Sequence, residues 1–503
     1  MRLALAQRAV NGMANAFCLA FLIVTFLALL CYYGETMMPV IPDESLFLQP
    51  AQSLAEGQGM GTPALDDLLP GISQRTYWQP PVYFLALAAW GEAFGFTIAS
   101  TRWFSRFCAV GVLLLLWAMA KRFGASNGLA FLCVLWTSLD LAFQYNANRG
   151  RMDSLNALLI LGSWLALEAH RRDGKVWQAL LAGFMGSLAT LTHFLAIPVT
   201  ALMAISLFWR KQWLACLAFL LPFGIGWGFW LLYAMQDWHG FVAQLLLQFA
   251  RKAEETDFAG IAVKMLFLQS LVPLFGVFPV NTPPIWFALI AVSLWAWHRH
   301  RLFGGAQVAM WVALYVAAAL GGEVWYVGWF IPFGYLLLTV WANFLWAQSP
   351  KRQILLAIGI LWGGFQSVQV VRVFSAIPSL KAETERFQKE IVKVLPPQAK
   401  VILHSVPDPF PTLRRVRPDL QLVQLSPTPM NPDTLQRLQE HYSFFVGIED
   451  WGKSRTRLSL QPQKEWRFQV LDRGWVVKVC EVCGANFGQE GSGEKERDRK
   501  RQP

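Results

Sequence analysis

Charge is scarce in this sequence. Only 15% of its 503 residues are Asp, Glu, Lys or Arg, against about 25% in an average soluble domain. Seven cysteines are too few for a disulfide-rich secreted scaffold, and the glycines follow no triplet repeat, which excludes a collagen-like chain. Apolar residues make up 55% of the chain, with 24 Trp and 37 Phe, and this content excludes a disordered protein. The remaining class is a membrane protein with several spans.

Intervals without Asp, Glu, Lys or Arg locate the candidate spans, because a helix needs roughly 20 apolar residues to cross a bilayer. Such intervals lie at 9–34, 107–120, 123–139, 154–167, 212–236, 302–322, 324–350 and 353–371. Two intervals are longer. The interval 176–209 is predicted to cross twice, with a turn near His193, and the interval 265–298, which prolines interrupt, is predicted to cross once. We therefore predict an all-α polytopic membrane protein with about eleven transmembrane helices.

The basic residues of the short loops set the predicted orientation. With the N-terminus in the cytoplasm, the basic clusters all fall on the cytoplasmic side, as the positive-inside rule requires. These clusters are Lys121/Arg122, Arg171/Arg172/Lys175, Arg210/Lys211, Arg299/Arg301 and Lys351/Arg352. The apolar run after Pro80 is too short to span, so residues 80–95 are predicted to form an interfacial helix on the outer face. The first span lacks a small-residue cleavage site, which predicts an uncleaved anchor. The expected location is the plasma (inner) membrane.

The chain divides into three predicted parts. Residues 1–372 form the transmembrane domain, and 35–100 are its long outer loop. Residues 373–483 form a small extracytoplasmic α/β domain, and 484–503 form a polar disordered tail. Within the small domain, helices are predicted at 384–394 and 434–441, and strands at 400–404, 420–425, 444–448, 466–471 and 475–479.

Two adjacent carboxylates, Asp43 and Glu44, follow the first span. They suit a general base or a cation ligand at the membrane surface. They equally suit the start of an interfacial helix, where acidic residues are favourable. Carboxylate oxygens can also hold Mg²⁺ or Mn²⁺, so a divalent cation stays an open alternative and no other cofactor is expected.

Several cations are predicted on the same outer face. Arg149, Arg151 and Asp153 occupy a short turn between two helices, where ionisable residues are functional candidates; the alternative is a local Arg–Asp ion pair that holds a helical hairpin. Arg102 and Arg106 precede the second span and could receive a phosphate, although each taken singly suits snorkelling to lipid headgroups. Arg251 and Lys252 are further candidates for phosphate binding. Tyr326 is first interpreted as part of an aromatic interface belt, and a lipid or sugar site is its second interpretation.

The order of these features resembles a known family. Asp43-Glu44 is followed by Tyr77-Trp78-Gln79-Pro80-Pro81, then by Arg102 to Arg106 at the start of a span, then by the turn from Asn148 to Asp153. This pattern, over about residues 14–210 and more weakly to about 370, resembles the GT-C glycosyltransferases of the protein O-mannosyltransferase and aminoarabinose-transferase type, glycosyltransferase family 39. The resemblance implies a GT-C-like fold and a glycosyltransferase that inverts the anomeric carbon. It would pass a hexosyl or pentosyl group from a polyprenyl-phosphate donor to a lipid, glycan or protein acceptor at the outer membrane face.

The resemblance also implies roles for residues. Asp43 matches the family's loop carboxylate, the expected base, and Glu44 its neighbour, while Arg151 with Asp153 matches the second-loop motif. The expected substrate- or phosphate-binding set is Arg149, Arg151, Asp153, Arg251, Lys252, Tyr77, Gln79 and Tyr326. One departure is Trp78-Gln79, where the family often has Glu-Lys, so Arg75 or Arg251 with Lys252 would have to substitute. The expected partners are the donor and membrane lipid, with no nucleic acid.

The chemistry of such a transfer fits the residues independently. It needs one carboxylate to deprotonate the acceptor, cations for the departing phosphate and an apolar groove for the lipid. The alternative function is a transporter or lipid flippase, a class that places its functional charges near the middle of the bilayer. A third option is a non-catalytic scaffold that presents the C-terminal domain.

Overall fold

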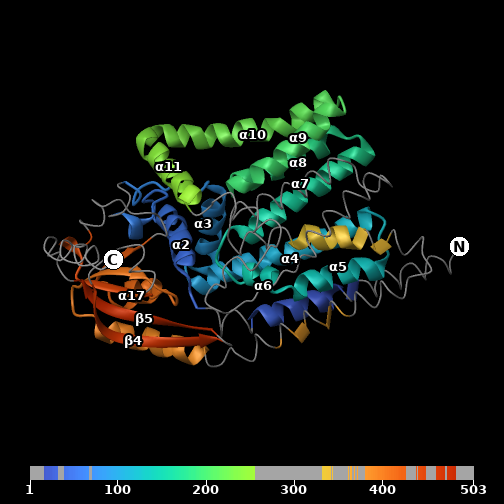
Figure 1. The fold of residues 1–503 in the computed structure, drawn as a ribbon. Coiled ribbons are helices and arrows are strands. Elements are labelled where there is room, and N and C mark those ends of the chain that lie inside the picture. The colour runs from blue at the N-terminus through green and yellow to red at the C-terminus, as the bar shows by residue number, and fades with distance from the viewer. Residues whose placement is uncertain are drawn as a thin grey trace, which may run out of the picture.

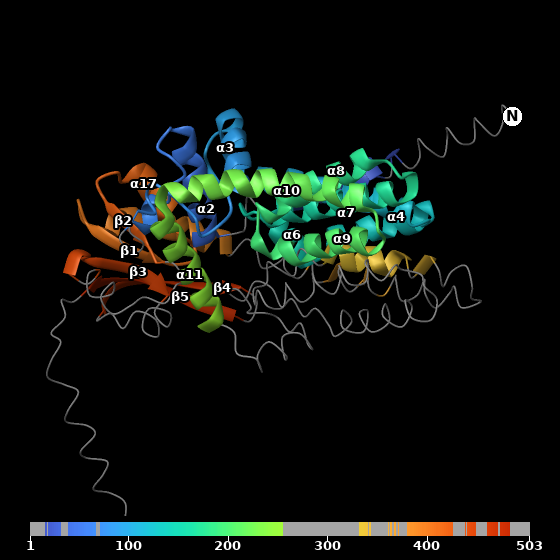
Figure 2. The same cartoon turned by 90° about the horizontal axis from the view of Figure 1, so that it is seen from above.

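The computed structural model describes residues 16–31, 39–66, 71–254, 331–343, 380–425, 438–448 and 460–482, apart from single positions within these ranges, together with short pieces between 361 and 371. Figure 1 shows a bundle of helices on one side and a small sheet on the other. Helices α2 (Pro42–Ala55) and α3 (Val82–Phe94) lie between the two, as the second view in Figure 2 also shows.

The bundle is built from consecutive apolar helices. They are α4 (Ile98–Arg122), α5 (Asn127–Leu139), α6 (Leu141–Ala147), α7 (Asp153–Asp173), α8 (Val176–Thr190), α9 (Ile197–Trp209) and α10 (Trp213–Ala234). Capping side chains explain several boundaries, since Thr97 and Ser126 accept hydrogen bonds from the first turns of α4 and α5. Gly174 ends α7 in the left-handed conformation that glycine tolerates.

Two sequence predictions can be compared directly with these helices. The interval 176–209 forms α8 and α9, joined by a turn that contains His193 and the 3-10 helix η2 (Phe194–Ala196), as expected for a hairpin. The segment 80–95 forms the short helix α3, and the N–H of Val82 donates to the Leu191 carbonyl at 2.9 Å. This bond joins α3 to the hairpin turn at the end of the bundle.

Two described stretches are long and apolar enough to cross a membrane, Ile98–Arg122 and Trp213–Gln248. The 22 residues of α10 are about 33 Å long, close to the ~30 Å of a hydrocarbon core. The other described apolar helices are shorter, and the intervals 265–298 and 302–322 lie outside the described residues. The total of about eleven spans therefore stays a prediction.

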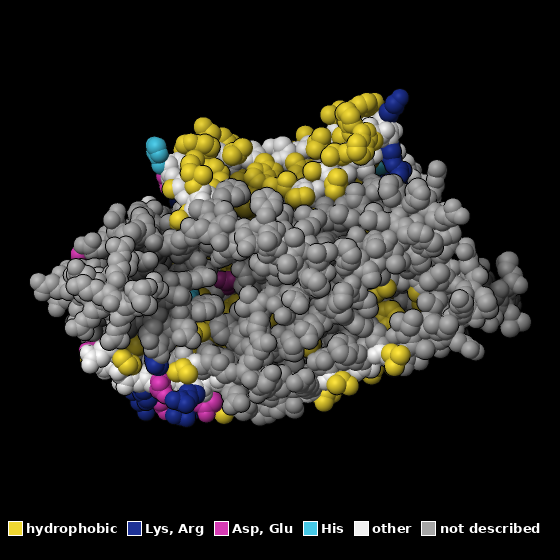
Figure 3. Space-filling model, viewed as in Figure 1, with side chains coloured by type: hydrophobic (Ala, Val, Ile, Leu, Met, Phe, Trp, Pro, Cys, Tyr) yellow, Lys and Arg dark blue, Asp and Glu magenta, His cyan; other side chains and the backbone are white. Residues whose placement is uncertain are grey.

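A band of exposed apolar side chains runs along α8, α9 and α10. It includes Trp177, Leu180, Leu181, Phe184, Ile205, Phe208, Leu214, Leu217, Leu221, Ile225, Phe229 and Leu232. Figure 3 shows this hydrophobic surface, with basic side chains near one end and a histidine near the other. Monomeric soluble proteins rarely expose apolar surface of this extent, so the band is the surface expected to face lipid.

The basic loops gather at one end of the bundle. Arg122, at the end of α4, donates to the Glu168 carbonyl of α7 at 2.9 Å. Arg171, at the end of α7, donates to Ser206 Oγ of α9 at 2.9 Å. The loops after α4, α7 and α9 therefore lie together, opposite the end where α4 and α7 begin.

The C-terminal part contains a five-stranded sheet in the order β2-β1-β3-β5-β4. Its strands are β1 (Lys400–His404), β2 (Gln421–Gln424), β3 (Phe444–Ile448), β4 (Leu460–Val470) and β5 (Arg473–Val482). Strand β1 pairs in parallel with β2 and β3, and β5 is antiparallel to β3 and β4. The predicted helix at 384–394 lies within a helix over 380–394. Helix α17 (Phe410–Val416) was not predicted, because seven residues are too few to show a helical period.

The C-terminal sheet and the segment over residues 39–66 share one hydrophobic core. Leu46 of α2 and Leu65 of the 3-10 helix η1 (Pro63–Leu65) are buried in the same cluster as Phe410 and Leu413 of α17 and Val446 of β3. Burial of such side chains contributes about 1.5–3 kcal/mol each. Segments more than 300 positions apart are thus held as one body, and α2 is fixed from the side of the sheet.

Candidate functional site

The acid pair lies in the first turn of α2. Pro42 occupies the first helical position, where its missing N–H leaves no bond unmade. The Glu44 carboxylate accepts a hydrogen bond from the Ile41 N–H at 3.3 Å, and negative charge is favourable at a helix N-terminus. The interpretation of Asp43-Glu44 as a helix start is therefore confirmed, and the start of α2 carries both carboxylates to the end of the bundle.

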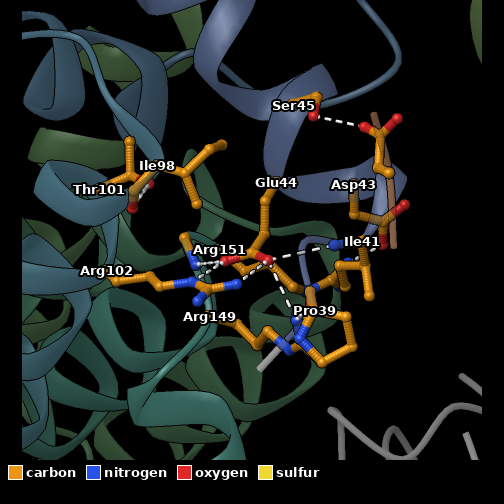
Figure 4. Close-up of polar contacts among 12 residues, drawn as sticks. Pro39, Ile41, Asp43, Glu44, Ser45, Ile98, Thr101, Arg102, Arg149 and Arg151 are labelled. Atoms are coloured by element: carbon orange, nitrogen blue, oxygen red, sulfur yellow. Dashed lines mark hydrogen bonds and ion pairs between the residues drawn. The ribbon is translucent and has the colours of Figure 1, made fainter. Parts of the chain in front are cut away.

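Glu44 is a fully buried carboxylate held by two arginines. Its Oε1 accepts from Arg102 Nε at 2.8 Å and from the Gly150 N–H at 2.9 Å, while Oε2 accepts from Arg102 Nη2 at 2.8 Å and Arg149 Nη1 at 3.0 Å (Figure 4). Burial raises the pKa of Glu44, but the guanidiniums of Arg102 and Arg149 and the Gly150 N–H more than offset this and lower it to about 2. Glu44 is therefore a poor proton acceptor at neutral pH and an anchor for the arginines.

Asp43 faces the third arginine and remains accessible. Its Oδ2 forms an ion pair with Arg151 Nη1, and its side chain keeps 25% of its surface exposed. Arg151 Nε also donates to Asp153 Oδ2 at 2.9 Å, and its guanidinium lies over the Phe47 ring at 5.2 Å. The predicted local Arg–Asp pair is therefore present, and Arg151 joins it to the acid pair. Among these charged side chains of α2 and the turn, Asp43 has the greatest access to solvent.

Arg102 and Arg106 correct the expectation that each snorkels to lipid headgroups. The Arg102 side chain is 7% exposed and binds Glu44 through two nitrogens. Arg106 is fully buried, donates Nε to Asn148 Oδ1 at 3.0 Å and lies over the Trp103 ring. The bidentate contact with the Glu44 carboxylate turns Arg102 inward, and the amide oxygen of Asn148 together with the Trp103 ring holds Arg106 there. Four guanidiniums thus lie near three carboxylates, a balance that suits an incoming anion.

Gly150 allows the arginine turn to approach α4. A Cβ placed on Gly150 would lie 2.4 Å from Thr101 Oγ1 and 3.0 Å from Thr101 Cβ. Any side chain at this position must push the turn away from α4. The Arg-Gly-Arg spacing is therefore a steric requirement of the site.

Gly150→Ala is expected to destabilise the protein by about 1–3 kcal/mol, the usual cost of overpacking, and to misplace Arg149 and Arg151. Thermal unfolding in detergent measures the change. Gly128→Ala in α5 is the matched control, because a Cβ there has nothing within 4 Å. Equal unfolding temperatures for the two variants would contradict the steric account.

Tyr77 belongs to an aromatic cluster beside the acid pair's helix. It is buried, its N–H donates to Gln244 Oε1 at 2.6 Å, and its ring lies 5.8 Å from that of Trp230. The half-buried Gln79 follows it, and between them Trp78 stacks on Phe47 at 5.4 Å. Trp78, which stands where the resembled family often has Glu, thus packs on the Phe47 ring, and the Arg151 guanidinium lies over that same ring.

Three other candidates are less defined. Arg251 and Lys252 lie near the end of helix α11 (Trp238–Glu254), and their side chains, like the whole of Tyr326, lie outside the described residues. The described part of the chain contains no group of three or more His, Cys, Asp or Glu side chains that could hold a metal ion. Asp43 and Glu44, the pair considered for Mg²⁺ or Mn²⁺, each pair with an arginine.

Known structures with the same arrangement of helices and sheet were found by structural comparison. ArnT from Cupriavidus metallidurans in the apo state matches with a TM-score of 0.56 and 13% identity, over 96% of this chain and 100% of that chain. ArnT bound to undecaprenyl phosphate matches with a TM-score of 0.53 and 12% identity, over 94% and 99%. The chain has a GT-C fold.

A third GT-C structure is similar over most of the chain. The oligosaccharyltransferase AglB from Archaeoglobus fulgidus, in complex with an inhibitory peptide and a dolichol-phosphate, matches with a TM-score of 0.53 and 10% identity, over 87% of this chain and 70% of that chain. No protein-family model and no curated protein matches the sequence. The GT-C likeness is thus carried by structure over 94–96% of the chain, whereas the sequence resemblance lies over about residues 14–210 and more weakly to about 370.

Proposed function

We propose that this protein is an inverting glycosyltransferase that moves a sugar from a polyprenyl-phosphate donor to a hydroxyl group of a lipid, glycan or protein. The observation that carries the proposal is the pairing of the accessible carboxylate of Asp43 with the buried guanidinium of Arg151. The GT-C fold supports it, and so do the undecaprenyl phosphate and dolichol-phosphate bound by two proteins of this fold. The donor, the sugar and the acceptor belong to the proposal.

In the proposed reaction Asp43 is the base. Its carboxylate takes the proton of the acceptor hydroxyl, and the acceptor oxygen forms a bond to the anomeric carbon from the face opposite the phosphate. The bond between that carbon and the phosphate oxygen breaks, and its electron pair leaves with the phosphate. Because a phosphate is stable as an anion, no general acid is required, in contrast to glycoside hydrolysis.

Arg149 and Arg151 hold the departing phosphate in this scheme. A guanidinium offers two parallel donors to phosphate oxygens, and cations that meet charge as it develops lower the barrier. Asp153 orients Arg151 through its hydrogen bond to Nε. The donor phosphate competes with Asp43 for Arg151 Nη1, and this competition frees the Asp43 carboxylate for the acceptor proton.

The membrane arrangement follows from the charge distribution. The basic loops lie at the end of the bundle away from the site, and by the positive-inside rule this supports a site and a C-terminal sheet on the outer face of the plasma membrane. The exposed apolar band along α8, α9 and α10 then faces lipid. The lipid tail of the donor would lie along the bundle, with its phosphate at the arginine turn.

The function is tested by incubating the purified protein with sugar-labelled polyprenyl phosphates and candidate acceptors, then measuring the mass of each acceptor. Gain of one sugar mass by an acceptor, with release of polyprenyl phosphate, is expected. Movement of the lipid across proteoliposomes without any covalent change would contradict the proposal and support a flippase.

Arg151→Ala is expected to weaken donor binding about 10- to 100-fold, since a hydrogen bond to a charged group contributes about 1.5–3 kcal/mol. Binding of undecaprenyl phosphate, measured by native mass spectrometry, gives the change. Arg415→Ala, an exposed arginine of α17, is the matched control and should bind like the wild type. An unchanged affinity of Arg151→Ala for undecaprenyl phosphate would show that Arg151 has a structural role and does not bind the donor.

A further inference from the structure

Asp408 of the C-terminal domain is buried against the start of α2. It follows strand β1, and its residue is 1% exposed. Its N–H donates to the Val40 carbonyl at 2.7 Å, and its Oδ2 accepts from Ser45 Oγ at 2.5 Å. Val40 and Ser45 stand on either side of Asp43-Glu44 in the sequence, so the contacts of Asp408 bracket the acid pair.

The neighbours of Asp408 reinforce this contact. Its Oδ2 also accepts from Gln424 Nε2 at 2.6 Å, and its Oδ1 accepts from the Phe410 N–H at 3.0 Å. Gln424 Oε1 in turn accepts from Gln49 Nε2 of α2 at 3.4 Å. The C-terminal domain therefore holds α2 at two successive turns through one chain of side-chain hydrogen bonds.

The place of this contact in the sheet is informative. Asp408 follows the carboxyl end of β1, and Gln424 ends the neighbouring parallel strand β2. In open α/β sheets the carboxyl ends of parallel strands form the usual ligand-binding edge. Here that edge is occupied by α2, which makes the small domain a support for the helix that carries the acid pair.

We propose that Asp408 is a positioning residue of the transfer site. It fixes the first turn of α2 so that the Asp43 carboxylate stays in contact with the Arg151 guanidinium. The inference rests on the proposed function. Glu44 and the arginines hold α2 from the bundle side, and Asp408 holds the same turn from the side of the sheet. With one side released, the turn can rotate about the Glu44 anchor, and Asp43 moves with it.

The hydrogen bonds of Asp408 indicate which substitution preserves its role. An amide of the same shape keeps one oxygen, which can still accept from Ser45 Oγ and Gln424 Nε2 and so preserves the contact with α2 without the charge. Burial also raises the pKa of Asp408 to about 7, although the hydrogen bonds from Ser45, the Phe410 N–H and Gln424 lower it. Asp408→Asn is the conservative variant, and Asp408→Ala removes the contact.

The test measures turnover and backbone protection in full-length variants. Asp408→Ala is expected to lower kcat about 10- to 100-fold, the effect of a misplaced catalytic group, with unchanged affinity for undecaprenyl phosphate. Asp408→Asn should restore most of the turnover. Hydrogen–deuterium exchange of the peptide over residues 41–48 should rise in Asp408→Ala. Asp419→Ala is the matched control, because Asp419 pairs with Arg417 on an exposed surface of the same domain.

Wild-type turnover and wild-type exchange in Asp408→Ala would overturn the proposal. So would turnover in Asp408→Asn as low as in Asp408→Ala, since charge rather than position would then be responsible. If Asp408→Ala does not fold, Ser45→Ala breaks the same hydrogen bond from α2, and wild-type turnover and exchange there would overturn it equally. Absence of transfer by the wild type contradicts the proposed function alone, because the exchange measurement tests the contact without activity.

Discussion

Asp43→Asn is expected to lower transfer activity about 100- to 10,000-fold, the usual contribution of a general base. The amide keeps the shape of the side chain but cannot take the acceptor proton. Folding should be nearly unchanged, because Asp153 still pairs with Arg151 and a partly exposed ion pair contributes about 0–1 kcal/mol. Sugar transfer to the acceptor under single-turnover conditions measures the loss.

Asp66→Asn is the matched control for this variant. Asp66 is an exposed carboxylate of the segment that follows α2, and its Oδ1 accepts a long hydrogen bond from the Ser73 N–H. This variant should transfer sugar like the wild type. If Asp43→Asn turns over at the rate of Asp66→Asn, Asp43 is not the base of the reaction.

Glu44→Gln is expected to act mainly on stability. Arg102 and Arg149 would lose their shared carboxylate while they remain buried, and removal of one partner from a buried ion pair costs about 3–5 kcal/mol. Because the pKa of Glu44 is lowered to about 2, its contribution to stability is complete above its ordinary value of 4.5 and is lost as the pH falls toward 2. The difference from the wild type should therefore narrow in acid.

Unfolding by denaturant in detergent, followed from pH 7 to pH 3, checks this result. Glu56→Gln is the control at the C-terminal end of α2, since Glu56 is exposed and accepts a hydrogen bond from Gln52 at 2.8 Å. It should match the wild type throughout. A Glu44→Gln variant as stable as Glu56→Gln would show that Glu44 does not anchor the arginines. Together the two acid variants separate a base from an anchor in one dipeptide.

Much of the helical part could be predicted from the sequence because bilayer thickness fixes the length of apolar intervals. The hairpin at 176–209 follows from the interval length together with the basic loops on both sides of it, and the short helix after Pro81 from an apolar run too short to span. In the small domain, β1 (Lys400–His404) and β3 (Phe444–Ile448) were predicted with the correct bounds because short runs of apolar, β-branched and aromatic residues favour strands. Strands β4 and β5 are longer than predicted, because cross-strand pairing extends them through polar residues such as Gln461 and Glu481.

The partners within the site could not be predicted in the same way. The sequence indicated that Asp43-Glu44 and the turn from Arg149 to Asp153 carry chemistry, since ionisable residues are rare near spans. It gave no sign that Glu44 binds Arg102, because that pairing depends on how α2 meets α4. The contact of Ser45 with Asp408 joins residues 363 positions apart, and no local pattern encodes it. Gly150 had a local signal, its place between two arginines, that a steric argument could have used.

The account depends on a lipid phosphate binding where the start of α2 meets the turn from Arg149 to Asp153. A structure of the protein with bound undecaprenyl phosphate tests this most directly. We expect phosphate oxygens within hydrogen-bonding distance of the Arg151 guanidinium, beside Asp43, with the polyprenyl chain against the apolar bundle. A phosphate bound at the opposite end of the bundle, near Arg210 and Lys211, would contradict the account.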